Sequence, residues 1–183
     1  MIFKNINDFM EWRDICHDVI KFHQSIMMTS GGFDPLHVGH LRCIQETVKL
    51  ANDPKRFPSA AKPLVTVLVN CDDFLKAKKG YNFMSLEDRM EIIHAIKGVD
   101  CVLPWFYKND DFTVVKAIHT IKPKWFTKGG DRTDATNIPE WEICQQIGCD
   151  IITDVGGKKI RSSSELIEAC LLYTSPSPRD LMR

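Results

Sequence analysis

The sequence has no excess of charge of either sign. Lys and Arg together number 24, as do Asp and Glu, so the formal net charge is zero. A chain without a net field has no broad attraction for nucleic acid or for an acidic membrane surface, and we expect neither as a partner. Apolar runs are short, and none approaches the roughly 20 residues of a membrane span. The first residues show no signal-peptide pattern, which predicts a cytoplasmic protein.

Cysteine pairs with metal-binding spacing are also missing. The seven cysteines are odd in number and scattered, and no two of them form a Cys-x-x-Cys motif. Several lie in apolar runs, which indicates reduced core residues rather than a disulfide framework or a zinc site. A chain of 183 residues has the length of one ordinary domain and is long enough to bury a core.

The most informative stretch that is present runs Gly-Gly-Phe-Asp-Pro-Leu-His-Val-Gly-His over residues 31–40. An apolar run at residues 25–29 precedes it and an amphipathic run follows it, which predicts a strand, a tight glycine turn and the start of a helix. This junction points backbone N–H groups and the positive end of a helix at one place, where anions bind. His37 and His40 are three residues apart, so their rings share one helix face and can donate to the same anion. The pattern predicts a phosphate site.

This stretch resembles the signature of the cytidylyltransferase-like nucleotidyltransferases, in which a glycine turn is followed by Phe-Asp and by His-x-Gly-His. The matching positions are Gly31, Phe33, Asp34, His37, Gly39 and His40. The resemblance implies that His37 and His40 are catalytic residues that hydrogen-bond the phosphates of a nucleotide. It assigns the rest of the signature, together with Gly32 of the glycine turn, to nucleotide binding.

Three lysines crowd the segment after the next predicted strand, residues 64–70. The local pattern of residues 71–81 is typical of a solvated charged loop. The resemblance implies instead that this segment holds the triphosphate, with Lys76 for nucleotide binding and Lys78 as a catalytic residue. It also implies that Arg89, in the helix that follows, reaches the nucleotide.

Two later loops complete the resemblance. The Lys-Gly-Gly-Asp sequence resembles the nucleotidyltransferase domain of ADP-heptose synthases, and it implies that Gly130 and Asp131 bind the nucleotide. Ser162, Ser163 and Ser164 stand at the predicted start of the last helix. Hydroxyls there can simply cap the helix, or they can bind phosphate oxygens with the helix dipole behind them. The resemblance favours phosphate and assigns all three serines to the nucleotide.

Five short apolar runs alternate with helical patterns. The predicted strands are residues 25–29, 64–70, 99–104, 125–127 and 150–155. Such alternation predicts an α/β fold, with a Rossmann-like, doubly wound five-stranded parallel sheet in a single domain. In an open parallel sheet the loops at the carboxyl ends of the strands meet in one crevice, so the four motifs are expected to converge there.

The domain organisation follows from these boundaries. Residues 1–24 are predicted to be an N-terminal helical extension, with an amphipathic helix over residues 8–24 that packs on the domain. Residues 25–170 form the nucleotidyltransferase domain that the resemblance implies. Residues 171–183 contain two Ser-Pro steps and are predicted to be a disordered tail. The tail also resembles translated read-through of a sequencing-library adaptor, so its native origin is left open and it is kept out of the functional interpretation.

The resemblance implies a transferase that joins an NTP to a small phosphorylated sugar or alcohol and releases pyrophosphate. Negative charge develops on the α-phosphate and on the departing pyrophosphate, so such a site needs fixed donors rather than a covalent nucleophile. The Lys-Gly-Gly-Asp sequence favours ATP and an acceptor like heptose 1-phosphate. Mg²⁺ is expected to accompany the triphosphate, bound by phosphate and water rather than by a protein ligand. Resembling enzymes commonly form homodimers, which the sequence itself leaves open.

Other classes share parts of this pattern. The first alternative is a CTP-dependent enzyme that acts on glycerol 3-phosphate. Nicotinate-nucleotide adenylyltransferases resemble the Gly-Gly-Phe-Asp-Pro-Leu-His stretch as well, and a test with nicotinate mononucleotide would distinguish them. Class I aminoacyl-tRNA synthetases share a related histidine motif, but the sequence has no Lys-Met-Ser-Lys-Ser equivalent. A non-enzymatic nucleotide sensor would bind NTP tightly without releasing pyrophosphate.

Overall fold

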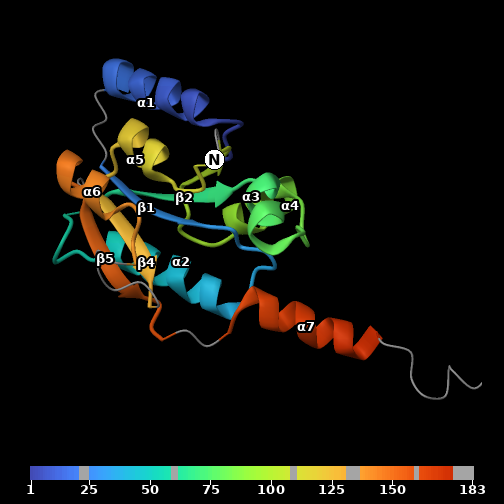
Figure 1. Ribbon diagram of the computed structural model, residues 1–183. Coiled ribbons are helices and arrows are strands. Elements are labelled where there is room, and N and C mark those ends of the chain that lie inside the picture. The colour runs from blue at the N-terminus through green and yellow to red at the C-terminus, as the bar shows by residue number, and fades with distance from the viewer. Residues whose placement is uncertain (21–24, 59–61, 108–110, 131–136, 159–160, 175–183) are drawn as a thin grey trace, which may run out of the picture.

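A sheet of five parallel strands runs through the centre of the protein in the order β3-β2-β1-β4-β5 (Figure 1). The computed structural model describes residues 1–20, 25–58, 62–107, 111–130, 137–158 and 161–174. The strands are β1 (Ile26–Gly31), β2 (Leu64–Asn70), β3 (Cys101–Trp105), β4 (Trp125–Gly129) and β5 (Asp150–Val155). The predicted Rossmann-like α/β sheet of five parallel strands in one domain is confirmed.

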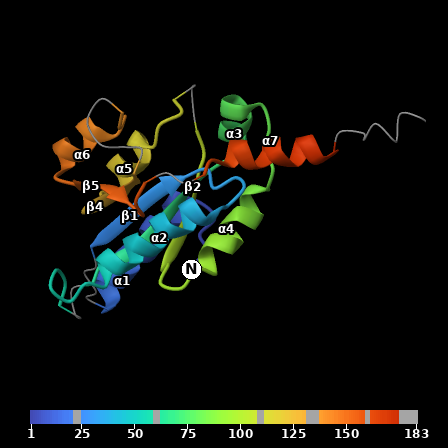
Figure 2. The ribbon, with the colours of Figure 1, turned by 90° about the horizontal axis from the view of Figure 1, so that it is seen from below.

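Helices cover both faces of this sheet. They are α1 (Ile6–Ile20), α2 (Val38–Ala51), α3 (Asp72–Lys79), α4 (Leu86–His94), α5 (Val115–Ile121), α6 (Trp141–Ile147) and α7 (Ser163–Thr174). The α1, α5 and α6 helices pack on one face, whereas α2 and α4 pack on the other (Figures 1 and 2). None of the described helices is long and apolar enough to cross a membrane.

The continuous apolar run of β2 is explained by burial on both faces of the sheet. Val67 and Val69 belong to the cluster under α2 and α4, while Leu68 points into the cluster under α1, α5 and α6. All three side chains are fully buried. A strand with no solvated face needs no polar alternation, so β-branched and other apolar residues fill it from end to end.

The sheet opens at its carboxyl edge between β1 and β4. The pairing of β1 with β2 extends as far as Gly31, opposite Val69, whereas the pairing of β1 with β4 ends at Thr29, opposite Thr127. The chain also reverses direction across the sheet here, because β2 and β3 lie on one side of β1 and β4 and β5 on the other. Ligands of open α/β sheets bind at such a switch point, so the site is expected here.

The lysine-rich segment that was interpreted as a loop is a helix, and that prediction was wrong. Asp72 and Asp73 lie in the first turn of α3, and the three lysines lie in its last turn. Acidic residues in the first turn and basic residues in the last turn both interact favourably with the helix dipole and stabilise the helix. Gly80 then ends the helix with a left-handed φ of 84°. The lysines therefore sit on a defined helix end.

The two ends of the chain depart from the predicted boundaries. The α1 helix begins at Ile6, two residues earlier than predicted, and packs through Phe9, as expected for an extension that rests on the domain. The predicted residues 21–24 of that helix lie outside the described residues. The α7 helix continues to Thr174, four residues beyond the predicted domain end, so a tail beginning at residue 171 was wrong for its first four residues. Its end agrees with the Ser-Pro step at residues 175–176, because a residue before proline disfavours helix.

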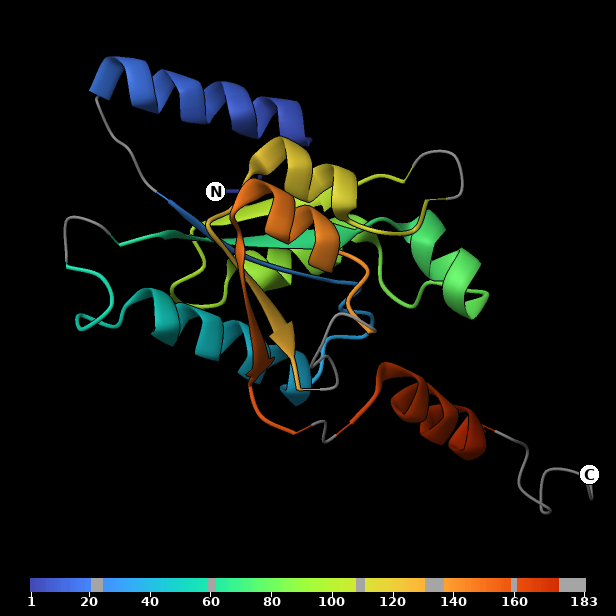
Figure 3. The same ribbon diagram turned by 60° about the vertical axis from the view of Figure 1, so that its left-hand side comes forward.

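The start of α7 packs against the rest of the domain, and Ser163 and Ile167 are buried there. The helix begins beside the loop between β1 and α2 and then projects away from the sheet (Figure 3). The remaining residues of the predicted tail, 175–183, lie outside the described residues.

Candidate active site

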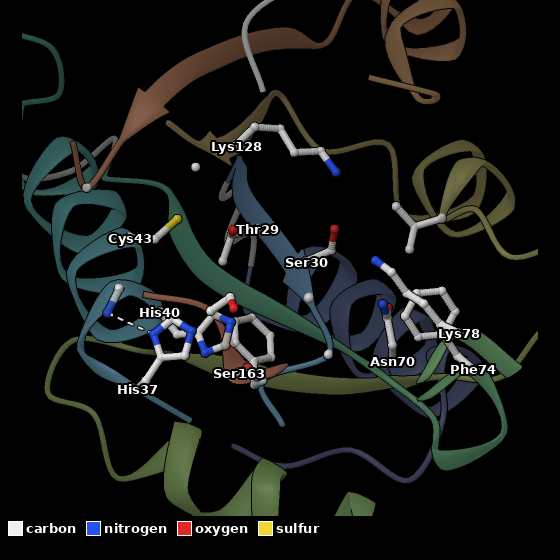
Figure 4. A pocket seen from close by; sticks show the side chains of 18 of the residues that line it. Thr29, Ser30, His37, His40, Cys43, Asn70, Phe74, Lys78, Lys128 and Ser163 are labelled. Carbon is white, nitrogen blue, oxygen red and sulfur yellow. Dashed lines mark hydrogen bonds between the residues drawn. The ribbon is translucent and has the colours of Figure 1, made fainter. Parts of the chain in front are cut away.

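A cavity of about 780 Å³ opens where β1 and β4 diverge (Figure 4). Its walls come from the loop between β1 and α2, the first turn of α2, the α3 helix, the ends of β4 and β5, and the start of α7. The predicted site residues that line it are Gly31, Gly32, Phe33, His37, Gly39, His40, Lys78, Gly130, Ser162, Ser163 and Ser164. The fold thus brings segments more than a hundred residues apart into one cavity.

His37 caps the N-terminus of α2. Its Nδ1 accepts a hydrogen bond of 3.0 Å from the backbone N–H of Gly39 (Figure 4). An acceptor Nδ1 places the proton of the neutral ring on Nε2, so Nε2 is the donor of this side chain. Gly39 has no Cβ, and one added there would lie 2.9 Å from Cε1 of His37. The glycine is therefore required for the ring to cap.

His40 stacks on His37 in the first turn of α2. The ring centroids are 3.8 Å apart and the ring planes differ by 21°. The ring of Phe33 also contacts His40, at 5.3 Å between centroids and an interplanar angle of 74°. Burial lowers the pKa of His40 to about 3, and the neighbouring His37 and Lys79 add to the effect. The ring is therefore neutral at physiological pH, and its buried Nδ1 has no hydrogen-bond partner in the part of the chain that the structure describes.

Asp34 lies beneath the cavity rather than in its wall. Only 1% of the residue is exposed, and its carboxylate accepts hydrogen bonds of 2.8 Å from the backbone N–H groups of Phe83 and Met84. Its backbone carbonyl accepts a third bond from Nζ of Lys79. This aspartate ties the histidine-bearing loop to the segment between α3 and α4, which is a positioning role in this structure.

Arg89 is also placed beneath the loop, at 1% exposure, and is not part of the cavity wall. Its guanidinium donates to the backbone carbonyls of Gly32, Asn70, Met84 and Ser85 and pairs with the carboxylate of Asp72. These contacts join the glycine turn, the end of β2 and the starts of α3 and α4. The side chain thereby sets where the lysines of α3 stand relative to the histidine pair.

The lysines of α3 differ in their placement. Lys78 is exposed and lines the cavity, with Nζ 5.5 Å from the ring centroid of Phe74. Lys76 is exposed but does not reach the cavity wall. Lys79, by contrast, lines the cavity, and burial lowers its pKa. Lys78 and Lys79 are therefore the cations of α3 that face the cavity.

The three serines at the start of α7 have separate partners. Ser162 caps the helix: its Oγ accepts from the N–H of Glu165 at 3.2 Å, and the Glu165 carboxylate accepts from the N–H of Ser162 at 3.0 Å. This is a reciprocal capping box. Ser163 is buried and its hydroxyl donates to the carbonyl of Pro35, which fixes α7 against the histidine-bearing loop. Ser164 is exposed and lines the cavity.

A buried ion pair lies in the wall opposite the histidines. Nζ of Lys128, at the end of β4, is 3.1 Å from Oε2 of Glu140, and the side chains are 14% and 6% exposed. Gly130 follows on the same strand end, where an added Cβ would collide with the backbone carbonyl of Gly157. The bare backbone of Gly130 is needed for β4 and β5 to close this corner of the cavity.

Comparison with known proteins decides the family. A family model described as cytidylyltransferase-like matches residues 28–168. The chain belongs to the cytidylyltransferase-like family. The relatives include Bifunctional protein HldE of Syntrophotalea carbinolica, which is 26% identical over 168 residues, covering 87% of this chain and 29% of that protein. Bifunctional protein HldE of Haemophilus ducreyi is 32% identical over 136 residues, covering 73% of this chain and 24% of that protein. The chain thus spans less than a third of the length of these relatives.

The cytidylyltransferase-like fold is also seen in a solved structure. The lipopolysaccharide core biosynthesis protein from Thermoplasma volcanium superimposes with a TM-score of 0.53 at 22% identity, covering 74% of this chain and 99% of that chain. At this identity the likeness speaks for the fold. Together with the family match, it makes this chain a nucleotidyltransferase domain of the cytidylyltransferase-like kind.

Three predicted site residues of this cytidylyltransferase-like domain are outside the cavity wall: Asp34, Lys76 and Arg89. The predicted site residue Asp131 lies outside the described residues. Sequence reasoning missed Glu140 and Asn70, both of which line the cavity and are buried. The only local signal for Glu140 was its place after Pro139 at the start of a helix, and no motif contained Asn70.

Proposed function

We propose that this protein transfers the nucleotidyl group of an NTP, with ATP favoured, to a small phosphorylated sugar of the heptose 1-phosphate type. An oxygen of the acceptor phosphate forms a bond to the α-phosphorus, the bond between the α- and β-phosphates breaks, and pyrophosphate leaves. The observation that carries the proposal is the stacked pair of His37 and the neutral His40 at the N-terminus of α2, inside a cavity that a second helix start also faces. Membership of the cytidylyltransferase-like family supports it.

The histidines act as hydrogen-bond donors in this mechanism. His40 has a pKa near 3, so it is already neutral and is a poor proton acceptor, but a ring N–H can donate to the phosphate where charge develops. His37 donates through Nε2 because its Nδ1 is occupied by Gly39. The N-terminus of α2, which His37 caps, favours the same anion through the helix dipole. No covalent nucleophile is required.

Cations and hydroxyls around the histidines hold the remaining phosphates. Lys78 and Lys79 face the cavity from α3, and Ser164 faces it from the start of α7. In the described residues no three His, Cys, Asp or Glu side chains gather as a metal site. Mg²⁺ would be held by phosphate oxygens and water, and it would neutralise the charge of the triphosphate.

The choice of ATP and a sugar 1-phosphate is supported by the Lys-Gly-Gly-Asp sequence, which resembles that of ADP-heptose synthases. Lys128 and Gly130 of this sequence line the cavity. CTP with glycerol 3-phosphate is the competing pair of substrates, and both pairs use the same phosphate chemistry.

Pyrophosphate release tests the proposal. ATP and CTP are each offered with heptose 1-phosphate, glycerol 3-phosphate and nicotinate mononucleotide, and we expect the highest kcat/KM for ATP with the sugar phosphate. His40→Ala should lower kcat by about a hundredfold or more, because it removes a donor to the transition state. The exposed His119→Ala is the matched control. Tight NTP binding with no pyrophosphate release for any acceptor, or unchanged turnover in His40→Ala, would overturn the proposal.

A further inference from the structure

The ion pair of Lys128 and Glu140 takes no part in the phosphate chemistry proposed above, yet it is part of the cavity wall. Glu140 is 5% exposed, and its Oε2 accepts no hydrogen bond of good geometry from any described residue, although Nζ of Lys128 stands 3.1 Å away. A buried carboxylate with unused acceptor capacity is costly unless a ligand or water satisfies it. This points to a polar ligand group at Glu140.

The chemistry of the pair selects the kind of group that fits. Lys128 neutralises Glu140, so the ligand group there needs no net charge. The carboxylate only accepts hydrogen bonds and the ammonium only donates them. Two neighbouring hydroxyls are complementary to such a pair, because one can donate to Glu140 while the next accepts from Lys128. A sugar carries hydroxyls on neighbouring carbon atoms and therefore offers such a pair.

The surroundings of the pair favour a sugar over a nucleobase. The aromatic side chains that line the cavity in the described residues are Phe33, Phe74, Tyr107 and Phe112. They come from the loop after β1, from α3 and from the segment between β3 and α5. The described lining residues from the end of β4 to the start of α6 are instead Lys128, Gly129, Gly130, Pro139 and Glu140. Among these described residues there is no aromatic ring on which a base would stack.

The position of the pair also separates it from the phosphates. Lys128 reaches into the cavity from the end of β4, across from His37 and His40 on α2 (Figure 4). A substrate whose phosphate lies at the histidines can therefore place its sugar at Lys128 and Glu140.

We propose that Glu140, held in place by Lys128, binds sugar hydroxyls of a substrate. The inference rests on the proposed function for the presence of a sugar in this cavity. The hydroxyls come either from the ribose of the NTP or from the acceptor sugar, and both offer the same chemistry to the carboxylate.

A cycle of protein and substrate changes tests this in binding experiments. Calorimetry gives Kd for ATP, 2′-deoxy-ATP and 3′-deoxy-ATP, and for mannose 1-phosphate and its 2-, 3- and 4-deoxy analogues. Each is measured with the unaltered protein, with Glu140→Ala and with Glu140→Gln. Glu142→Gln, exposed on the same helix, is the matched control. Thermal melting establishes that each variant is folded, and the isosteric Glu140→Gln serves if the alanine variant is not.

The expected result is a loss of affinity of about tenfold to a hundredfold for at least one deoxy analogue with the unaltered protein, the range for a hydrogen bond to a charged group. In Glu140→Ala the ratio of the Kd of the deoxy analogue to the Kd of the parent ligand falls to about one. In Glu140→Gln this ratio is reduced, and in Glu142→Gln it persists. If the ratio changes among the ATP analogues, Glu140 binds the ribose; if it changes among the mannose 1-phosphate analogues, Glu140 binds the acceptor sugar. The inference is overturned if no deoxy penalty depends on Glu140. Because binding needs no turnover, this outcome is independent of whether pyrophosphate is released.

Discussion

Arg89 donates a hydrogen bond of 2.6 Å to the backbone carbonyl of Gly32, so the turn that leads to the histidine pair is held by a buried arginine of α4. The same Nη1 atom donates to the carbonyl of Asn70 at the end of β2. The relative position of β1, β2 and α3 at the cavity therefore depends on a side chain that does not line it.

Arg89→Met is expected to lower the free energy of unfolding by about 3–5 kcal/mol, because it leaves several buried carbonyls and Asp72 without their donor. Urea denaturation measures the change. Arg89→Lys should recover only part of it, since a single ammonium cannot reach all the partners of the guanidinium. Arg56→Met, at an exposed arginine, is the control and should be close to neutral. A loss below about 1 kcal/mol in Arg89→Met would show that the buried bonds contribute little.

The low pKa of His40 predicts a pH-dependent stability. In the unfolded chain the imidazole titrates near 6.5, whereas in the folded protein it titrates near 3. Between these values the unfolded state binds more protons, so stability falls as pH drops from 6.5 towards 3, by up to about 1.4 kcal/mol per pH unit.

Urea denaturation at several pH values within that window measures the slope, and His40→Gln is the comparison. The glutamine variant carries no titrating ring, so its stability should depend less steeply on pH. Equal slopes in the two proteins would mean that His40 titrates normally in the folded state.

Gly39→Ala is expected to damage catalysis more than folding. The new Cβ would lie 2.9 Å from Cε1 of His37 and would push the ring out of its cap. Because misplaced catalytic groups are costly, we expect kcat to fall at least about tenfold. Alanine in a helix is more favourable than glycine by up to about 1 kcal/mol, so thermal stability should change little. Val38→Ala, in the same turn and exposed, should keep its activity; equal losses in both variants would contradict the steric argument.

The serines at the start of α7 should separate structural from phosphate roles. Ser162→Ala removes the helix cap and should cost about 1 kcal/mol of stability. Ser164→Ala should leave stability unchanged and raise KM for the NTP several-fold, the effect of one lost hydrogen bond. Thermal melts and initial rates measure the two quantities. The assignment of Ser164 to phosphate binding fails if the KM of Ser164→Ala for the NTP equals that of the unaltered protein.

Elements whose pattern is local were predicted well. β2 and β5 have the predicted boundaries, residues 64–70 and 150–155, because an apolar run bounded by turn residues identifies a strand without reference to the rest of the chain. The two histidine rings are adjacent as expected, but His37 is the extended N-cap residue of α2, so its cap to Gly39 positions the ring as well as the spacing of three.

Elements that depend on tertiary contacts were missed. The α3 helix is short and highly charged, and it is held by the burial of Leu75 and by the pairing of Asp72 with Arg89. No local pattern contains those contacts. The ion pair joins Lys128 to Glu140, twelve positions further along the chain, so neither residue alone signals it. The direction of Arg89, whose guanidinium donates to backbone carbonyls of Gly32 and Asn70, is likewise set by packing.

The divergence of β1 and β4 beyond Thr29 divides the cavity between two halves of the sheet. His37 and His40 belong to the half that carries α2, whereas Lys128 and Glu140 belong to the half that carries α6. Substitutions at residues that share no partners usually add independently. Evolution or protein engineering can therefore change the specificity of one half without disturbing the chemistry of the other, and a single scaffold of this kind can serve many acceptors.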